Sequence, residues 1–404
     1  MGRLQTWGAA ARRSPVFWAV STVVVLALVA GGVVLATRST PPPAPSPATS
    51  TRAVSLGDSV PYGHGLHNPY LTPQVGLPAD AVSQGPSTSA YPTLVAGDLG
   101  LTMTVRPTNC RLTGDQLSIS GAVADGADNT ARDGQCPVPP QQARNLSDEV
   151  AAADLARHPA RLVLLQDGAD DIDFARCLEY QLAQLLGTNL GIGKRCVANG
   201  AVTPTLASVL SNVRASLAQA IETMAPHAGT IAVLDYYQPI PRPSQIADDT
   251  FASNLHTNLV CTGLKANAGT TYASARVVLG ALNKAIAGAV ADARAHRVTN
   301  VTLVDVSAAV DGHGVCTSDP WIFAGEPVPD TTLAADASDV LVAKACTGTD
   351  ALHPSSACAS LVARAARAEK SLQGYVWRAV HPTAAGQRAI AAVVAQQLRS
   401  RTSP

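Results

Sequence analysis

Five short apolar runs, each separated from the next by a longer and more mixed segment, constrain the fold of this chain most. The runs are Ala53–Leu56, Leu101–Val105, Leu162–Leu165, Ile231–Leu234 and Val301–Val304. Short continuous apolar runs are typical of strands that are buried on both faces. Helix-like segments lie between and after them, at Pro204–Ala225, Arg276–Arg297 and Thr383–Leu398. The alternation predicts an α/β fold with a five-stranded parallel sheet and helices on both faces.

Two of the helix-like segments carry apolar residues at helical spacing. The stripe in the second segment consists of Val278, Leu282, Ile286, Ala289 and Ala293, and that in the first of Leu210, Val213, Leu217 and Ile221. An apolar stripe of this kind predicts a helix that packs on a core through one side.

The N-terminal region has a different organisation. An uncharged, mostly apolar stretch, Ser14–Thr37, follows three arginines, and a bilayer-spanning helix needs about 20 such residues. We expect a cytoplasmic N-terminus over residues 1–15, a transmembrane helix over 16–36, a proline-rich linker over 37–52 and one globular domain over 53–404. The alternative is a cleaved signal sequence. In both cases the globular part is exported, and in the first it is anchored to the cell membrane.

Eight cysteines lie outside the apolar N-terminal stretch. An even number of cysteines in an exported protein predicts disulfides. Pairing each cysteine with its neighbour along the chain gives Cys110–Cys136, Cys177–Cys196, Cys261–Cys316 and Cys346–Cys358. Sequence alone leaves other connectivities open.

Charge and composition limit the partners that we expect. The chain has 29 basic and 29 acidic side chains and only 4% aromatic residues. Nucleic-acid binding usually needs a basic face or aromatic stacking platforms, so we expect no nucleic-acid partner. Four aspartates between Asp167 and Asp173 lack histidine or cysteine at ligand spacing. We therefore expect neither a metal nor another cofactor.

The first apolar run leads directly into Gly57-Asp58-Ser59. Active sites of open α/β sheets lie at the carboxyl ends of the strands, and glycine lets the backbone turn sharply there. Ser59 would then begin a helix with its hydroxyl exposed at the sheet edge, as a nucleophile needs. Alternatively, Asp58 or Ser59 only caps a helix.

Four blocks taken in order extend this interpretation. They are Gly57-Asp58-Ser59, Leu117–Ala122 ending in Ser-Gly-Ala, Gly168–Phe174, and His381-Pro382 followed by Gly386 and an apolar helix. With these blocks the chain resembles the SGNH (GDSL-type) hydrolase superfamily, in particular exported actinobacterial esterases and lipases, from about Arg52 to Leu398. The resemblance implies a flavodoxin-like SGNH fold. It also implies that Ser59 attacks an acyl carbon, that His381 is the base, and that the amides of Ser59 and Gly121 stabilise the oxyanion.

The chain departs from the family pattern in front of the histidine. The family usually has aspartate three residues before it, and this chain has Arg378, whose side chain cannot accept a hydrogen bond. The backbone carbonyl of Arg378 is the acceptor that we expect instead. Asp350 and His353 keep the carboxylate–histidine spacing and form an alternative catalytic pair.

A second departure is Asp170, which stands where the family has a donor asparagine. An ionised carboxylate would repel an oxyanion, whereas burial can raise its pKa and leave a neutral carboxyl donor. The other interpretation is that this third donor is lost.

Together these features predict an extracytoplasmic serine ester hydrolase of the carboxylesterase or lipase type, acting through a Ser59 acyl-enzyme on a small-molecule, lipid or glycan ester. One alternative is an acyltransferase or O-acetyl esterase acting on envelope glycan or lipid. Another is a catalytically weak SGNH-like binding module of the cell envelope.

Overall fold

The structure is a computed structural model that describes residues 46–63, 66, 89–108, 111–114, 146–174, 176–178, 180, 194–247, 261, 264–323 and 380–402. The expected cytoplasmic segment, the transmembrane helix over 16–36 and most of the linker lie outside these residues.

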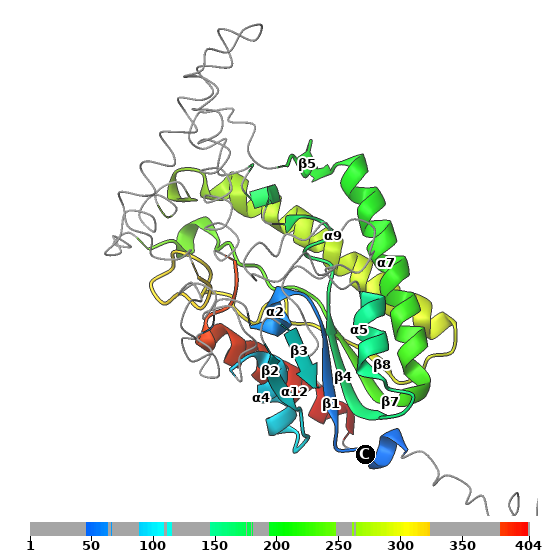
Figure 1. Ribbon diagram of the computed structural model, residues 1–404. Coiled ribbons are helices and arrows are strands. Elements are labelled where there is room, and N and C mark those ends of the chain that lie inside the picture. The colour runs from blue at the N-terminus through cyan, green and yellow to red at the C-terminus, as the bar shows by residue number, and fades with distance from the viewer. Residues whose placement is uncertain are drawn as a thin grey trace, which may run out of the picture. The chain divides into compact units, whose positions relative to one another are not determined.

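A parallel sheet of four strands forms the centre of the described residues (Figure 1). Its strands are β1 (Ala53–Gly57), β4 (Ala160–Gln166), β7 (Ala228–Leu234) and β8 (Val301–Val304), in the order β1-β4-β7-β8. The register pairs Gly57 with Gln166, Leu165 with Val233, and Leu234 with Val304. All four strands therefore end at the same level of one sheet edge.

The described residues contain four parallel strands rather than the five that were predicted. In the predicted strand Leu101–Val105, the contact with the parallel sheet is a single parallel bridge from Thr102 to Arg52. Thr102 and Thr104 are exposed and alternate with partly buried neighbours. This is the pattern of a sheet edge, whereas a central parallel strand is buried on both faces. The chain then leaves the sheet as an antiparallel hairpin of β2 (Val105–Thr108) and β3 (Arg111–Gly114).

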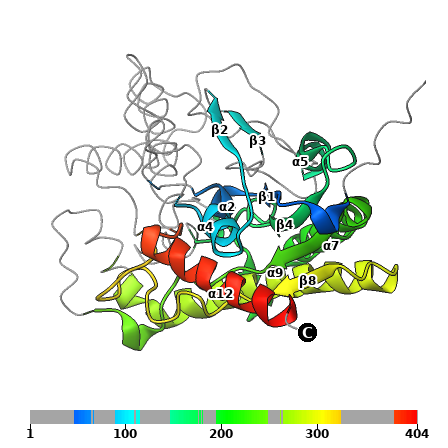
Figure 2. The ribbon, with the colours of Figure 1, turned by 90° about the horizontal axis from the view of Figure 1, so that it is seen from below.

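Helices cover both faces of the sheet (Figures 1 and 2). On one face α7 (Pro204–Met224) packs along α9 (Ala268–Ala295), and on the other α4 (Tyr91–Asp98) packs against α12 (Ala384–Thr402). The shorter elements are α2 (Ser59–Tyr62), α5 (Leu146–Ala153), η2 (Pro47–Thr49), η3 (Ala225–His227), η4 (Pro243–Gln245), β5 (Val197–Ala198) and β6 (Ala201–Val202). The α/β class with a parallel sheet is confirmed.

The predicted apolar faces of the two long helices are confirmed, since every residue named for each stripe is buried. Thr203 caps α7 by accepting a hydrogen bond from the Leu206 amide at 3.4 Å, and Pro204 occupies the first turn. The other helix, α9, begins at Ala268 rather than at Arg276. Its length and composition alone would allow it to cross a membrane. Its buried stripe, however, packs within the core of the domain.

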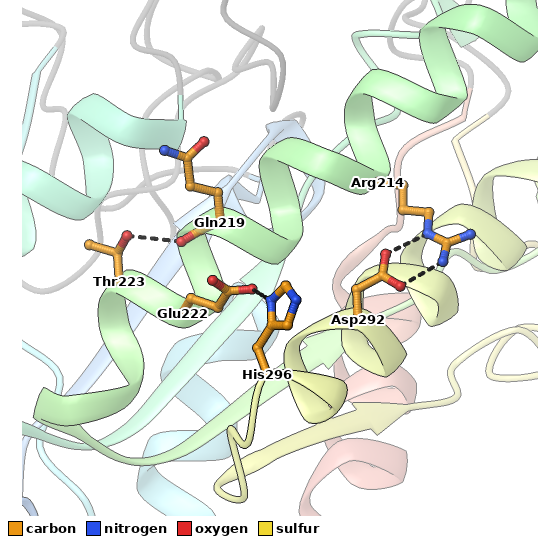
Figure 3. Close-up of polar contacts among 6 residues, drawn as sticks. All are labelled: Arg214, Gln219, Glu222, Thr223, Asp292 and His296. Carbon is orange, nitrogen blue, oxygen red and sulfur yellow. Dashed lines mark hydrogen bonds and ion pairs between the residues drawn. The ribbon is translucent and has the colours of Figure 1, made fainter.

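Two exposed ion pairs join α7 to α9 on their outer surface (Figure 3). Arg214 binds both carboxylate oxygens of Asp292, at 2.7 and 2.6 Å, and Nδ1 of His296 lies 2.7 Å from Glu222. The hydrogen bond from Arg214 lowers the pKa of Asp292, and the hydrogen bond to Glu222 raises the pKa of His296. The position of His296 after the last residue of α9 also suits a cation, because helix C-termini carry partial negative charge.

Two of the predicted disulfides are present, Cys177–Cys196 and Cys261–Cys316, each with a Cα–Cα distance of 5.5 Å. The other two predicted pairs, Cys110–Cys136 and Cys346–Cys358, lie outside the described residues. The two observed bridges stabilise the connections that follow β4 and β7, where the chain has long segments between regular elements.

Candidate active site

The turn between β1 and α2 requires glycine at its first position. Gly57 has φ +127°, and a Cβ atom there would lie 1.8 Å from the backbone oxygen of Gln166 on β4. Asp58 follows as the N-cap of α2 and accepts a hydrogen bond from the Val60 amide at 3.1 Å. Ser59 is consequently the first residue of a one-turn helix at the carboxyl edge of the sheet.

The structure brings Ser59 together with a histidine from the other end of the chain. Nε2 of His381 lies 2.6 Å from Oγ of Ser59, across 322 residues of sequence. His381 is 7% exposed, and Ser59 is partly exposed. Such a contact lets a neutral imidazole accept the serine proton, which is the requirement for activating a hydroxyl nucleophile.

Backbone contacts on both sides of His381 hold the segment that carries it. The Tyr237 hydroxyl donates to the Val380 carbonyl at 2.8 Å, and the Phe323 amide donates to the His381 carbonyl at 2.9 Å. The Thr383 amide donates to the Trp321 carbonyl at 2.8 Å. Hydrogen bonds to the backbone at residues 380, 381 and 383 therefore hold the segment that carries the imidazole, just before α12 begins.

A buried tyrosine connects the serine turn to the loop after β4. The Tyr236 hydroxyl donates to Oδ2 of Asp58 and accepts a hydrogen bond from the Ala169 amide at 3.3 Å. The backbone of Tyr236 is itself bracketed by the side-chain amide of Asn283, with contacts of 2.9 and 2.8 Å. Asp58 is fully buried, and this burial raises its pKa to about 7, although the Tyr236 hydrogen bond acts in the opposite direction.

An aspartate follows the last residue of every strand of the parallel sheet: Asp58, Asp167, Asp235 and Asp305. Because the four strands end at one level, these residues form a row along the carboxyl edge. Burial also raises the pKa of Asp235 to about 7, whereas hydrogen bonds from Ser307 lower the pKa of Asp305. Among the described residues, no group of three or more histidine, cysteine or acidic side chains is arranged to hold a metal ion.

The remaining predicted site residues have different outcomes. Asp170 lies in the turn that follows Gly168, where its carbonyl accepts from the Asp173 amide at 3.0 Å. Gly121, Arg378, Asp350 and His353 lie outside the described residues. The oxyanion amide of Gly121, the carbonyl of Arg378 and the alternative pair therefore stay predictions.

Sequence reasoning assigned no role to three residues that support this site, namely Tyr236, Tyr237 and Gln387. The two tyrosines come directly after Asp235 at the end of a buried strand, so their place at the sheet edge was a usable signal. Gln387 is a polar residue on the same side of α12 as the buried residues Ile390, Ala391 and Val394. A polar side chain on a buried helix face implies a specific hydrogen-bond partner.

No protein-family model matches this chain, and no curated protein does. Among solved structures, an extracellular lipase from Streptomyces rimosus is similar, with 15% identity and a TM-score of 0.41 over 86% of this chain and 99% of that chain. A carbohydrate esterase, described as having divergent catalytic and non-catalytic binding functions, is similar with 12% identity and a TM-score of 0.31, over 67% of this chain and 60% of that one.

Proposed function

We propose that this protein is a serine ester hydrolase of the carboxylesterase or lipase type, with Ser59 as nucleophile and His381 as base. The observation that carries the proposal is the 2.6 Å contact between Ser59 Oγ and His381 Nε2 at the carboxyl edge of a parallel sheet. Helix capping alone does not account for this contact, because Asp58 already caps α2.

The reaction follows from the positions of the two side chains. As Ser59 Oγ forms a bond to the acyl carbon, its proton passes to Nε2 of His381, and the carbonyl oxygen gains the negative charge. The tetrahedral intermediate then breaks its bond to the alcohol oxygen, which takes the proton from His381. Water repeats the sequence on the acyl-enzyme, releasing the carboxylic acid and restoring the Ser59 hydroxyl.

The oxyanion needs donors beside Ser59. In a helix, the first backbone amides have no partner within the helix, and the Asp58 carboxylate accepts from Val60. We assign the Ser59 amide as one donor on this basis and, by the family resemblance, the Gly121 amide as a second. Asp170, at the family's third donor position, can donate through its side chain only in the protonated form.

The proposed location is extracytoplasmic, with the N-terminal segment as a membrane anchor. The disulfides Cys177–Cys196 and Cys261–Cys316 support export, because disulfides persist mainly in oxidising compartments. The uncharged stretch Ser14–Thr37 has the length of a membrane span.

The experiment is hydrolysis of short-chain p-nitrophenyl esters by the chain from residue 46 onward and by the full chain in detergent. We expect turnover by both, and its loss in Ser59→Ala and in His381→Ala. Asp98→Asn, a substitution of an exposed residue at the end of α4, is the control for handling and folding. Turnover that survives Ser59→Ala would place the activity elsewhere, and absence of turnover on any ester would favour a binding module.

A further inference from the structure

Gln387 lies between the two parts of the chain that supply the serine and the histidine. It is in the first turn of α12 and is fully buried. Its Nε2 donates to the Val60 carbonyl at 3.0 Å, and its Oε1 accepts from the Tyr91 amide at 2.8 Å. One side chain thus binds α2 and α4 at the same time, and α4 and α12 lie side by side (Figures 1 and 2).

Both partners of Gln387 are backbone groups at the ends of short helices. Tyr91 is the first residue of α4, and its N-cap residue Ala90 has no side chain that could accept from the helix amides. Val60 lies in a helix of one turn, and its carbonyl accepts a hydrogen bond from the Gly63 amide at 3.1 Å. Gln387 therefore supplies from α12 the cap that α4 lacks and a second tie to the helix of the nucleophile.

The same turn of α12 is connected to the histidine. The backbone amide of Gln387 donates to the Thr383 carbonyl at 2.8 Å, and Thr383 follows His381 by two residues. Gly386 allows the start of α12 to lie close to the backbone of Trp321, since a Cβ atom at residue 386 would lie 2.4 Å from the Trp321 carbonyl oxygen. Val60, in turn, directly follows Ser59. The path from nucleophile to base therefore consists of short backbone segments joined by the side chain of Gln387.

We infer that Gln387 is a positioning residue, which sets the distance between Ser59 and His381 by tying the start of α12 to the helix of the nucleophile. This inference rests on the proposed function, because it assigns a role in the same site. Gln387 itself touches neither reacting atom. Its loss should reduce the rate of Ser59 acylation rather than substrate binding.

The chain offers a matched control on the same helix. Gln397 also uses both ends of its amide on backbone groups, accepting from the Asp305 amide at 3.2 Å and donating to the Asp305 carbonyl at 2.7 Å. Its contacts hold the end of β8 rather than the nucleophile. Gln387→Leu and Gln397→Leu each remove from α12 a side-chain amide that makes two hydrogen bonds, but the bond to Val60 in the helix of the nucleophile is lost in the first variant alone.

The experiment compares both variants with the wild-type chain in ester hydrolysis, in labelling of Ser59 by a fluorophosphonate, and in thermal unfolding. For Gln387→Leu we expect kcat and the labelling rate to fall by about 10²-fold, the effect of misplacing reacting groups by about 1 Å. KM should change less than about twofold, since binding groups are untouched. Gln397→Leu should keep the wild-type kcat.

A second variant, Gln387→Glu, keeps the test informative if Gln387→Leu does not fold. The introduced carboxyl group still accepts from Tyr91, but it donates to Val60 only when it is protonated. The ratio of the kcat of this variant to the wild-type kcat should therefore rise as the pH falls, while the titration of His381 cancels in the ratio.

Two results would overturn the inference while leaving the proposed function in place: equal losses of kcat in both leucine variants, or a pH-independent ratio for Gln387→Glu. If the wild-type chain is neither labelled nor active, the proposed function itself fails, and the role of Gln387 fails with it.

Discussion

The hydroxyl of Tyr236 donates a hydrogen bond to the buried carboxyl group of Asp58, across 178 residues of sequence. This contact joins the end of β7 to the residue that precedes Ser59. Burial raises the pKa of Asp58 to about 7 despite the hydrogen bond, because an ionised carboxylate loses its hydration there. The residue next to the proposed nucleophile is therefore a group that holds its proton through mildly acidic pH.

The free energy of unfolding should depend on pH through Asp58 and Asp235. Each pKa is raised from 3.8 to about 7 in the folded chain. The folded state thus holds protons that the unfolded state has lost, and stability falls as pH rises from about 4 to about 7. For one fully effective group this fall amounts to as much as about 4 kcal/mol. Urea unfolding at several pH values should show a shallower fall in Asp58→Asn and in Asp235→Asn than in the wild-type chain.

The control for that measurement is Asp98→Asn, because Asp98 is an exposed residue at the end of α4. It should leave the slope against pH unchanged. Equal slopes for the wild-type chain and both buried-site variants would contradict the assignment of raised pKa values.

Gly57→Ala should destabilise the fold severely. The substitution places a Cβ atom 1.8 Å from the Gln166 carbonyl at a φ of +127°. We expect a loss of about 3 kcal/mol or more in the free energy of unfolding, since strained backbone and a clash with a central strand combine. Gly97→Ala is the matched control, because nothing lies within 4 Å of its added Cβ. That change should be neutral or stabilise α4 by up to about 1 kcal/mol. Similar urea midpoints for the two variants would refute this account of the turn.

Asp170→Asn should retain or raise ester hydrolysis at neutral pH. The amide always presents a donor, whereas the carboxyl group does so only when protonated. An added oxyanion donor is worth about 10²-fold to 10³-fold in kcat, so the gain would be large if the wild-type group is ionised. Initial rates at pH 7 and a thermal unfolding curve are needed together. A large loss of activity in a folded variant would count against any oxyanion role for this position.

His296 should titrate above its ordinary pKa of 6.5, because Glu222 accepts a hydrogen bond from it and stabilises the charged imidazole. NMR titration of the imidazole should show this shift, and Glu222→Gln should lower the pKa. Asp292→Asn should lower it by less, since Asp292 is the weakest of the contributing causes. The linked stability is present below pH 6.5 and is lost as pH rises through the folded pKa. An unchanged titration in Glu222→Gln would show that the pair is not formed in solution.

The local pattern of the sequence was enough to predict the long elements. The buried stripes of α7 and α9 were named residue by residue, and four of the five apolar runs form the parallel sheet. The fifth run, Leu101–Val105, is apolar at alternate positions, as at a sheet edge. A short apolar run in the sequence does not by itself distinguish an edge strand from a central strand. Two disulfides follow neighbour pairing, with sequence separations of 19 and 55 residues.

The supports of the site were harder to predict, because they depend on contacts between distant segments. Tyr236 reaches Asp58 across the sheet, and Gln387 reaches Tyr91 over 296 residues. Such pairs are set by strand order and helix packing, which appear only once the chain is folded. The sequence marks only where a polar group will need a partner, as with Gln387 on a buried helix face.

The most direct test of the central claim is mass-spectrometric mapping of fluorophosphonate labelling on the folded chain. The reagent reacts preferentially with a serine hydroxyl that a base has activated. If Ser59 and His381 act together, Ser59 will be the modified residue, and labelling will be lost in His381→Ala while the variant remains folded. Labelling of another serine, or undiminished labelling of Ser59 in His381→Ala, would contradict the account.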